Sequence, residues 1–248
     1  ERIPSLLTPS DSQKFFPEVM KAVEKIRRED PDFKAIYGVE GYYINDMLPA
    51  VKGKTSAGIR DSYIVFDLET TGLSAASERI IEIGAVRIVD GKITESFDTF
   101  VDNEKAISPE ITRLTSITNE MVAGAPSEQE AVEQFFRFCN GCELLIAHNA
   151  DFDMGFLRAA LRRCGREEDP VQIDTLIMAR AMYPTFKNFK LDTIAANLKI
   201  EQKHHHRADD DARVLAEIFQ KMLDTLGEEK HITTVMEINK SLSRQDIS

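Results

Sequence analysis

The chain has 248 residues, 42% of them hydrophobic, and its 31 basic and 42 acidic side chains give a net charge of −11. This length supports one good core with some residues to spare, but too few for a second full domain. No apolar run is long enough to span a membrane, so we expect no membrane partner.

The excess of acidic residues lies in the main part of the chain. The first sixty residues carry 10 basic and 9 acidic side chains, which leaves 21 basic against 33 acidic for the rest. A surface of this sign argues against nucleic-acid binding. However, a site built from carboxylates is neutralised locally by divalent metal, and a fragment can borrow basic surface from a larger parent. The net charge therefore neither supports nor excludes nucleic-acid binding.

Three cysteines, Cys139, Cys142 and Cys164, form an odd set that favours a reducing, cytoplasmic location. The first two have CxxC spacing. We expect no metal or redox function there, because no second Cys/His pair stands at zinc-finger spacing and the motif closes a helix instead of opening one.

The N-terminal part reads as an αβ appendage. Apolar residues have helical spacing over 15–28. The pattern of residues 34–40 predicts a strand followed by a turn. We assign this piece to residues 1–50. The small and polar residues of 51–60 predict a linker of low order. The chain begins at Glu1, so we expect it to be processed or cut from a longer protein.

The main domain is expected over 61–226, followed by a C-terminal tail, 227–248, that leads back to a larger parent chain. Hydrophobic patterns, the Asp90-Gly91 turn, and a capping box of Ser127 and Glu130 predict its elements. In chain order these are strands at 63–67, 79–89 and 92–101, a helix of about a dozen residues after Ser127, a strand at 143–147, a helix at 149–164, a strand at 171–173, two helices, and a last helix from 207 to 226. This order predicts an α/β fold with a mixed five-stranded sheet flanked by helices.

Two acids stand on the first of these strands. Asp67 and Glu69 are two residues apart, so both carboxylates should project from one face. Two anions held side by side need a cation. The alternative is a solvated strand edge with two acids on its wet face.

Two predicted helices each carry an acid at the head of an apolar stripe. Asp153 shares its face with Phe156, Leu157, Ala160, Leu161 and Cys164, and Asp211 with Val214, Leu215, Ile218 and Met222. Both carboxylates should therefore point inward, where an Asp without partners costs several kcal/mol. We expect each to be paired or bound to metal. The alternative is an acid favoured by the helix dipole.

His206 precedes Asp211 by five residues, about 140° around a helix, so we place it in the loop that enters the helix. From there it could take a proton from water near neutral pH. The run His204-His205-His206 could instead be a metal-binding tract or plain surface.

Three ordered segments resemble the exonuclease motifs of the DEDDh family. They are DLETTG at 67–72, AHNADFD at 147–153 and HRADDDA at 206–212, and the similarity runs from about Tyr63 to Leu223. The resemblance implies an RNase H-like fold and removal of nucleotides from 3′ ends with two divalent metals. It makes Asp67, Glu69, Asp153 and Asp211 the metal-binding, catalytic carboxylates and His206 the general base.

That chemistry needs these residue types. Phosphodiester hydrolysis brings hydroxide to an anionic phosphorus and releases an alkoxide, and two Mg²⁺ or Mn²⁺ ions would stabilise both oxygens. Hard cations of this kind prefer carboxylate ligands.

Substrate contacts are expected from residues within or next to the first two motifs. By resemblance these are Thr70, Thr71, Leu73, His148, Asn149 and Phe152, with Leu73 wedged against the terminal base and Phe152 available for stacking. Turn or core packing is the alternative for each of them. Lys190 belongs to a basic stretch that could contact phosphates or form a solvated face, namely Lys187, Lys190, Lys199, Lys203 and Arg207.

The N-terminal piece is similar to part of the PHP domain of PolC-type replicative DNA polymerases, in which the exonuclease is inserted into the PHP domain. FFPE at 15–18 and IYGVEGY at 36–42 carry the similarity, and Glu40 matches a PHP metal position. Thr8-Pro9-Ser10 stands where that family has Thr-Asp-His. We therefore predict no working PHP metal site.

Together these patterns predict a proofreading 3′→5′ exonuclease region that acts on single-stranded 3′ ends of DNA and releases nucleoside monophosphates. Its expected partners are the rest of a polymerase chain and the replisome. A free-standing exoribonuclease of the same family is the alternative enzyme, because no contact to a 2′-OH can be read. A metal-free replication scaffold is the alternative from another class, and a PHP-type phosphoesterase comes third.

Overall fold

The computed structural model describes residues 12–31, 33, 48–102, 105–201 and 207–242. Contacts divide the chain into two compact units, Glu1–Ile44 and Asn45–Ser248. In the first unit the described helix is α1 (Ser12–Glu29), whose last turn carries two arginines that suit the negative end of a helix dipole. The strand and turn predicted at 34–40, with Glu40, lie outside the described residues.

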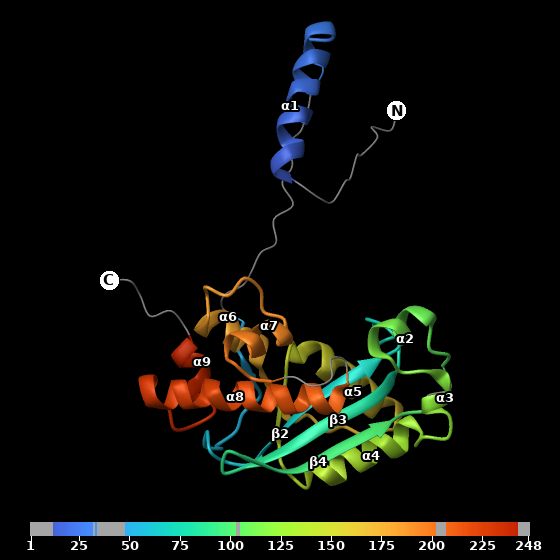
Figure 1. The fold of residues 1–248 in the computed structure, drawn as a ribbon, viewed down its shortest axis with the longest axis vertical. Coiled ribbons are helices and arrows are strands. Elements are labelled where there is room, and N and C mark those ends of the chain that lie inside the picture. The colour runs from blue at the N-terminus through green and yellow to red at the C-terminus, as the bar shows by residue number, and fades with distance from the viewer. Residues whose placement is uncertain (1–11, 32, 34–47, 103–104, 202–206, 243–248) are drawn as a thin grey trace. The chain divides into compact units, whose positions relative to one another are not determined.

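The second unit is built on a mixed sheet of six strands in the order β1-β6-β5-β2-β3-β4. Figure 1 shows β3 and β4 of this sheet side by side. The strands are β1 (Val51–Lys52), β2 (Tyr63–Thr70), β3 (Ile80–Val89), β4 (Lys92–Phe100), β5 (Leu144–Ala147) and β6 (Val171–Asp174). Pairs β2–β3, β3–β4 and β1–β6 are antiparallel, and β2–β5 and β5–β6 are parallel. The predicted mixed sheet is confirmed.

The sixth strand corrects the expected number of five and lies in the segment expected to be a linker. Val51 is 2% exposed and pairs with Ile173. The side chain of Asn239 accepts from the Val51 N–H at 2.9 Å and donates to its carbonyl at 2.8 Å. Ile59 is buried in the same core. Two apolar side chains thus tie residues 51–60 to the domain, although the strand is too short to show a periodic pattern.

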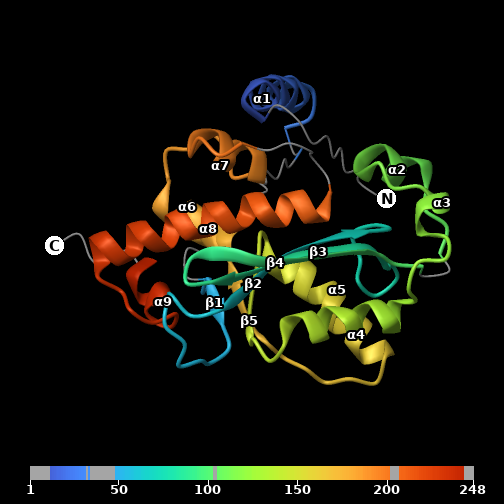
Figure 2. The same cartoon turned by 60° about the horizontal axis from the view of Figure 1, so that its bottom comes forward.

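Helices cover both faces of the sheet. They are α2 (Pro109–Thr115), α3 (Asn119–Val122), α4 (Glu128–Cys139), α5 (Ala150–Arg163), α6 (Thr175–Met182), α7 (Leu191–Asn197), α8 (Ala208–Lys230) and α9 (Glu237–Leu242). Figure 2 shows α8 on one side of the sheet and α4 and α5 on the other. The predicted capping box of α4 is confirmed, because Ser127 Oγ accepts from the N–H of Glu130 and the Glu130 carboxylate accepts from the N–H of Ser127.

Alternation along β2 divides the core into two clusters. Phe66 packs against Phe135 of α4 at a ring-centroid distance of 5.6 Å. Tyr63 packs edge-on against Phe219 of α8 at 5.1 Å. Because neighbouring side chains on a strand point to opposite faces, the odd-numbered positions of β2 face α8. Asp67 therefore projects toward the α8 side.

Two parts of the second unit differ from the sequence prediction. The short helices α2 and α3 were not predicted; each begins at a hydroxyl side chain, Ser108 or Thr118, that accepts a hydrogen bond from the first turn. The last long helix continues past 226 to Lys230, and Ile232 and Ile238 are buried in the core. The described part of the expected C-terminal tail is thus packed on the domain.

Candidate active site

Strand β2 supplies the first two acids of the candidate site. Asp67 and Glu69 are both half-buried near its carboxyl end, while their neighbour Leu68 is buried toward the opposite face. The prediction that the two carboxylates share a face is confirmed. That face is the one covered by α8.

Helix α8 brings the third acid to this place. One carboxylate oxygen each from Asp67, Glu69 and Asp211 lie within 4.8 Å of one another. Asp211 is 8% exposed, and the residues predicted to share its face are buried with it, namely Val214, Leu215, Ile218 and Met222. The predicted inward direction of Asp211 is confirmed.

Helix α5 brings a fourth acid from the other face of the sheet. Asp153 is 2% exposed and lies one turn into α5. Burial raises the pKa of Asp153 well above its usual range. Hydrogen bonds from its own N–H and from the N–H of Leu68 act in the opposite direction and lower it. The bond from Leu68 joins Asp153 to β2 at the residue between the other two acids. The predicted inward direction of Asp153 is confirmed as well.

The charges of neighbouring carboxylates add to the effect of burial on Asp67 and Glu69. Burial raises the pKa of Asp67 well above its usual range, and the charges of Asp153, Glu69 and Asp211 add to the effect in that order. The pKa of Glu69 is raised to about 8 by burial and by the negative charges of Glu82 and Asp211, while the positive charge of Arg207 lowers it. Crowded anions disfavour ionisation of one another, and a cation removes that cost. A set of carboxylate oxygens at this spacing fits hard divalent cations.

Sequence reasoning missed one buried acid beside this group. Glu82 is 0% exposed in β3 and lies opposite Glu69 in the strand register. It accepts hydrogen bonds from Arg207, which the sequence analysis grouped with phosphate-binding residues. A single charge within the apolar run Ile80-Ile81-Glu82-Ile83 was the signal that could have revealed it.

The hydroxyls that follow the first motif are engaged in the turn itself. Thr70 Oγ1 donates to the carbonyl of Gly72 at 2.7 Å, and Thr71 Oγ1 donates to Glu78 at 2.5 Å. Leu73, by contrast, is 89% exposed. The hydroxyls thus shape the turn, whereas the apolar side chain of Leu73 is left in water.

The predicted contacts from the second motif divide in the same way. His148 is half-buried, with Nδ1 at 2.9 Å from Thr175 Oγ1 and Nε2 at 2.8 Å from the carbonyl of Phe189. Burial lowers the pKa of His148, and this effect outweighs those of the Phe189 carbonyl and Asp174, which raise it. Because both ring nitrogens contact protein groups, the ring holds the segment before α7 in place. Phe152 is half-buried against Phe156 at a centroid distance of 5.0 Å.

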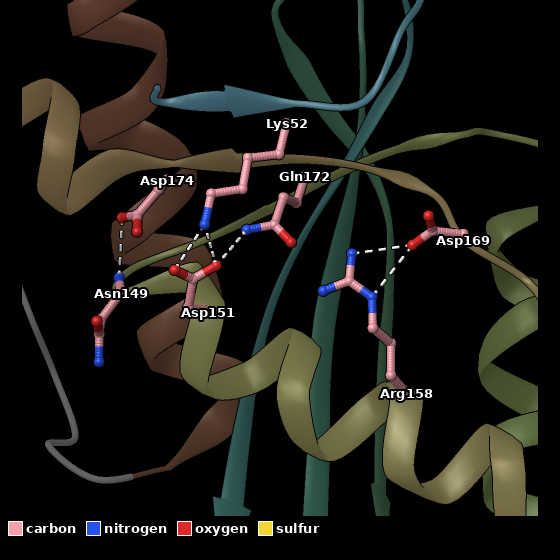
Figure 3. A network of polar contacts seen from close by, with 7 residues as sticks. All are labelled: Lys52, Asn149, Asp151, Arg158, Asp169, Gln172 and Asp174. Carbon is pink, nitrogen blue, oxygen red and sulfur yellow. Dashed lines mark hydrogen bonds and ion pairs between the residues drawn. The ribbon is translucent and has the colours of Figure 1, made fainter. Parts of the chain in front are cut away.

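Asn149 and Lys190 have exposed side chains at helix starts. Asn149 is the N-cap residue of α5 in the left-handed region, with φ of 65° and no side-chain cap bond, and its N–H donates to Asp174 (Figure 3). Lys190 is the N-cap residue of α7, and its neighbour Phe189 is held by His148. His206 and Lys203 lie outside the described residues.

A polar network secures the start of α5. Figure 3 shows Lys52 of β1 reaching Asp151, with Nζ at 2.5 and 2.6 Å from the two carboxylate oxygens. Gln172 of β6 donates to the same carboxylate at 2.8 Å. Asp174, at the end of β6, accepts from the N–H of Asn149 at 3.1 Å. Two strands thus anchor the helix that carries Asp153.

Within the described ranges, no helix has the length and hydropathy needed to span a bilayer.

Comparison with known proteins agrees with this geometry. The DNA polymerase III PolC-type of Caldanaerobacter subterraneus subsp. tengcongensis is 42% identical over 232 residues, which cover 94% of this chain and 16% of that protein. The DNA polymerase III PolC-type of Bacillus subtilis is 36% identical over 235 residues, covering 93% and 16% respectively. The chain thus spans about a sixth of the length of these curated relatives.

Solved structures share the fold. Exonuclease X in complex with 5′ overhanging duplex DNA is 28% identical with a TM-score of 0.57, covering 73% of this chain and 99% of that one. E. coli exonuclease I in complex with a dA16 oligonucleotide has a TM-score of 0.58 at 17% identity, covering 69% and 44%, and its likeness concerns the fold alone. The predicted RNase H-like fold is confirmed.

A family model described as exonuclease (RNase_T) matches residues 64–219, which include all four carboxylates of the site. This chain therefore belongs to the exonuclease (RNase_T) family.

Proposed function

We propose that this chain is the 3′→5′ exonuclease region of a PolC-type DNA polymerase and removes nucleoside monophosphates from single-stranded 3′ ends of DNA. The observation that carries the proposal is the convergence of Asp67, Glu69 and Asp211 from β2 and α8, with Asp153 of α5 close enough to perturb Asp67. The PolC-type relatives support the polymerase context, and the DNA in the exonuclease X complex supports the substrate. The rest of the polymerase chain and the replisome are the proposed partners.

The four carboxylates would hold two divalent ions, Mg²⁺ or Mn²⁺. When bound, these ions supply positive charge that stabilises the attacking and departing oxygens at phosphorus. The spacing of the carboxylates supports this proposal, and so do the raised pKa values of Asp67, Glu69 and Asp153, because a bound cation would offset the cost of ionising them. His206 is proposed as the base that takes a proton from water, a role based on its motif.

Residues around the acids would hold the end of the strand. Leu73 offers exposed apolar surface to the terminal base, and Lys190 offers a cation to a phosphate. Thr70 and Thr71 act through the turn that their hydroxyls brace. His148 fixes the backbone carbonyl of Phe189 next to Lys190.

The test is degradation of a single-stranded oligonucleotide labelled at its 5′ or its 3′ end, with Mg²⁺, Mn²⁺ or EDTA. We expect a ladder of shortening products from the 5′-labelled strand and immediate release of the 3′ label, both abolished by EDTA. Asp211→Asn should lower the rate by more than about 10²-fold, since loss of even an outer partner of a metal ligand costs 10–100-fold. The matched control is Glu217→Gln, an exposed acid on the same helix, which should match the wild type.

The same assay separates the alternatives. RNA of the same sequence degraded faster than DNA would replace the DNA proposal by an exoribonuclease. Shortening from the 5′ end would contradict the polarity. Purified, folded chain that degrades neither nucleic acid with either metal would support the scaffold alternative.

A further inference from the structure

Glu82 is a buried anion outside the three motifs. It is 0% exposed in the middle of β3. Its Oε1 accepts from Nε and Nη2 of Arg207 at 3.0 and 2.8 Å, and its Oε2 accepts from the backbone N–H of Ala208 at 3.1 Å. A carboxylate is buried at tolerable cost only when charged or hydrogen-bonding partners replace water. All three donors come from the point where α8 begins.

These bonds cap α8 from a distant part of the chain. Arg207 is the N-cap residue, and its side chain makes no capping bond to the helix. The first N–H groups of a helix lack intrahelical acceptors and carry a partial positive charge. Glu82 supplies the missing acceptor for Ala208, 126 residues away in sequence. The start of α8 is therefore fixed to β3 by one side chain.

The hydrogen bonds that Glu82 accepts from Arg207 and Ala208, here called the clamp, act close to Asp211. The N–H of Asp211 donates to the carbonyl of Arg207 at 2.9 Å, so Asp211 lies one helical turn from the clamped residue. On the other side, Glu82 is the cross-strand neighbour of Glu69 in β2. Glu82 thus stands between the two elements whose acids must meet.

Two further contacts hold the Arg207 side chain in place. Its guanidinium carbon lies 5.4 Å from the centroid of the Phe100 ring, and Nη2 is 3.9 Å from Asp98. Because donors occupy both oxygens of Glu82 and one of the partners is a cation, this carboxylate is unsuited to act as a fifth metal ligand. Glu82 instead supports the start of α8.

We propose that Glu82 is a positioning residue, which acts through Arg207 and Ala208 to hold Asp211 beside Asp67 and Glu69. The role rests on the proposed function, because it concerns the same metal-binding acids. It predicts that loss of Glu82 weakens metal binding while every proposed ligand is still present.

The test measures Mn²⁺ affinity of the full chain without DNA, from the electron paramagnetic resonance signal of free Mn²⁺. Glu82→Gln places an amide donor opposite the clamped donors and should weaken Mn²⁺ binding about 10–100-fold, as for other outer partners of metal ligands. Arg207→Lys keeps the charge but loses the fork of two donors and should weaken binding less. Glu95→Gln is the matched control, because Glu95 of β4 pairs with Arg87 of β3 at 3.8 Å, and it should bind as the wild type does.

DNA degradation provides the second readout. Saturating Mn²⁺ should restore degradation by Glu82→Gln, whereas Asp211→Asn should stay inactive because a ligand is missing. Folded Glu82→Gln with wild-type Mn²⁺ affinity overturns the positioning role and leaves the proposed function intact. If Glu82→Gln does not fold, Arg207→Lys decides, and wild-type affinity in that variant overturns the role. A wild type that binds no Mn²⁺ overturns the proposed function and the role with it.

Discussion

The stability of the metal-free chain should depend on pH through Glu69. Burial and the charges of Glu82 and Asp211 raise the pKa of Glu69 from 4.5 to about 8, against the effect of Arg207. A folded-state pKa above the unfolded value means that the folded chain holds the proton more tightly. The resulting stability is fully present below pH 4.5 and is lost as the pH rises through 8.

The size of this effect follows from the shift. At 1.36 kcal/mol per unit, the difference between 4.5 and 8 corresponds to about 5 kcal/mol at most. Because Glu69 is half-buried and solvent screens part of the repulsion, we expect about 2–3 kcal/mol. Glu69→Gln, which mimics the protonated side chain, should be equal to the wild type in free energy of unfolding at pH 4.5 and more stable than it by that amount at pH 8.

Urea denaturation in EDTA at pH 4.5, 6 and 8 measures this difference, with exposed Glu217→Gln of α8 as the control that should follow the wild type. Added Mn²⁺ should remove most of the difference at pH 8, since an ion at 100 times its Kd stabilises the wild type by about 2.7 kcal/mol and the variant lacks one ligand oxygen. Parallel pH profiles of the wild type and Glu69→Gln in EDTA would refute the electrostatic reasoning.

Three further substitutions test the packing around the site by urea denaturation. Phe135→Ala should lower the free energy of unfolding by about 3–5 kcal/mol, because the ring is 0% exposed against Phe66; a loss below about 1 kcal/mol would contradict its central place. Ser127→Ala should cost about 1 kcal/mol through loss of the α4 cap, and an unchanged stability would contradict the capping box. Lys52→Met should cost at most about 1 kcal/mol, because the pair with Asp151 is partly exposed, and the cost should shrink in high salt; a salt-independent loss would argue for packing instead.

The sequence was most informative where the spacing of residues on a single strand or helix determined the direction in which a side chain points. A spacing of two on a strand was enough to place Asp67 and Glu69 on one face, and helical spacing was enough to turn Asp153 and Asp211 inward. These are local rules, which hold whatever the rest of the chain does. Bringing the four acids together required the strand order, for which the motif resemblance supplied the expectation.

The sequence was least informative where the partner lies far along the chain. Glu82 showed only as an acid in an apolar strand, and its partner Arg207 is 125 residues away. His148 stands in a motif, but its bonds to Thr175 and Phe189 depend on the packing of β6 and the segment before α7. Strand β1 has two residues, too few for any periodic pattern.

The most direct test of the central claim is a crystal structure of the chain with Mn²⁺, with the ions located by their anomalous scattering. The account predicts anomalous peaks within coordination distance of Asp67, Glu69, Asp153 and Asp211, and their loss in crystals of Asp67→Asn. Active protein whose Mn²⁺ peaks lie away from these four carboxylates would contradict it.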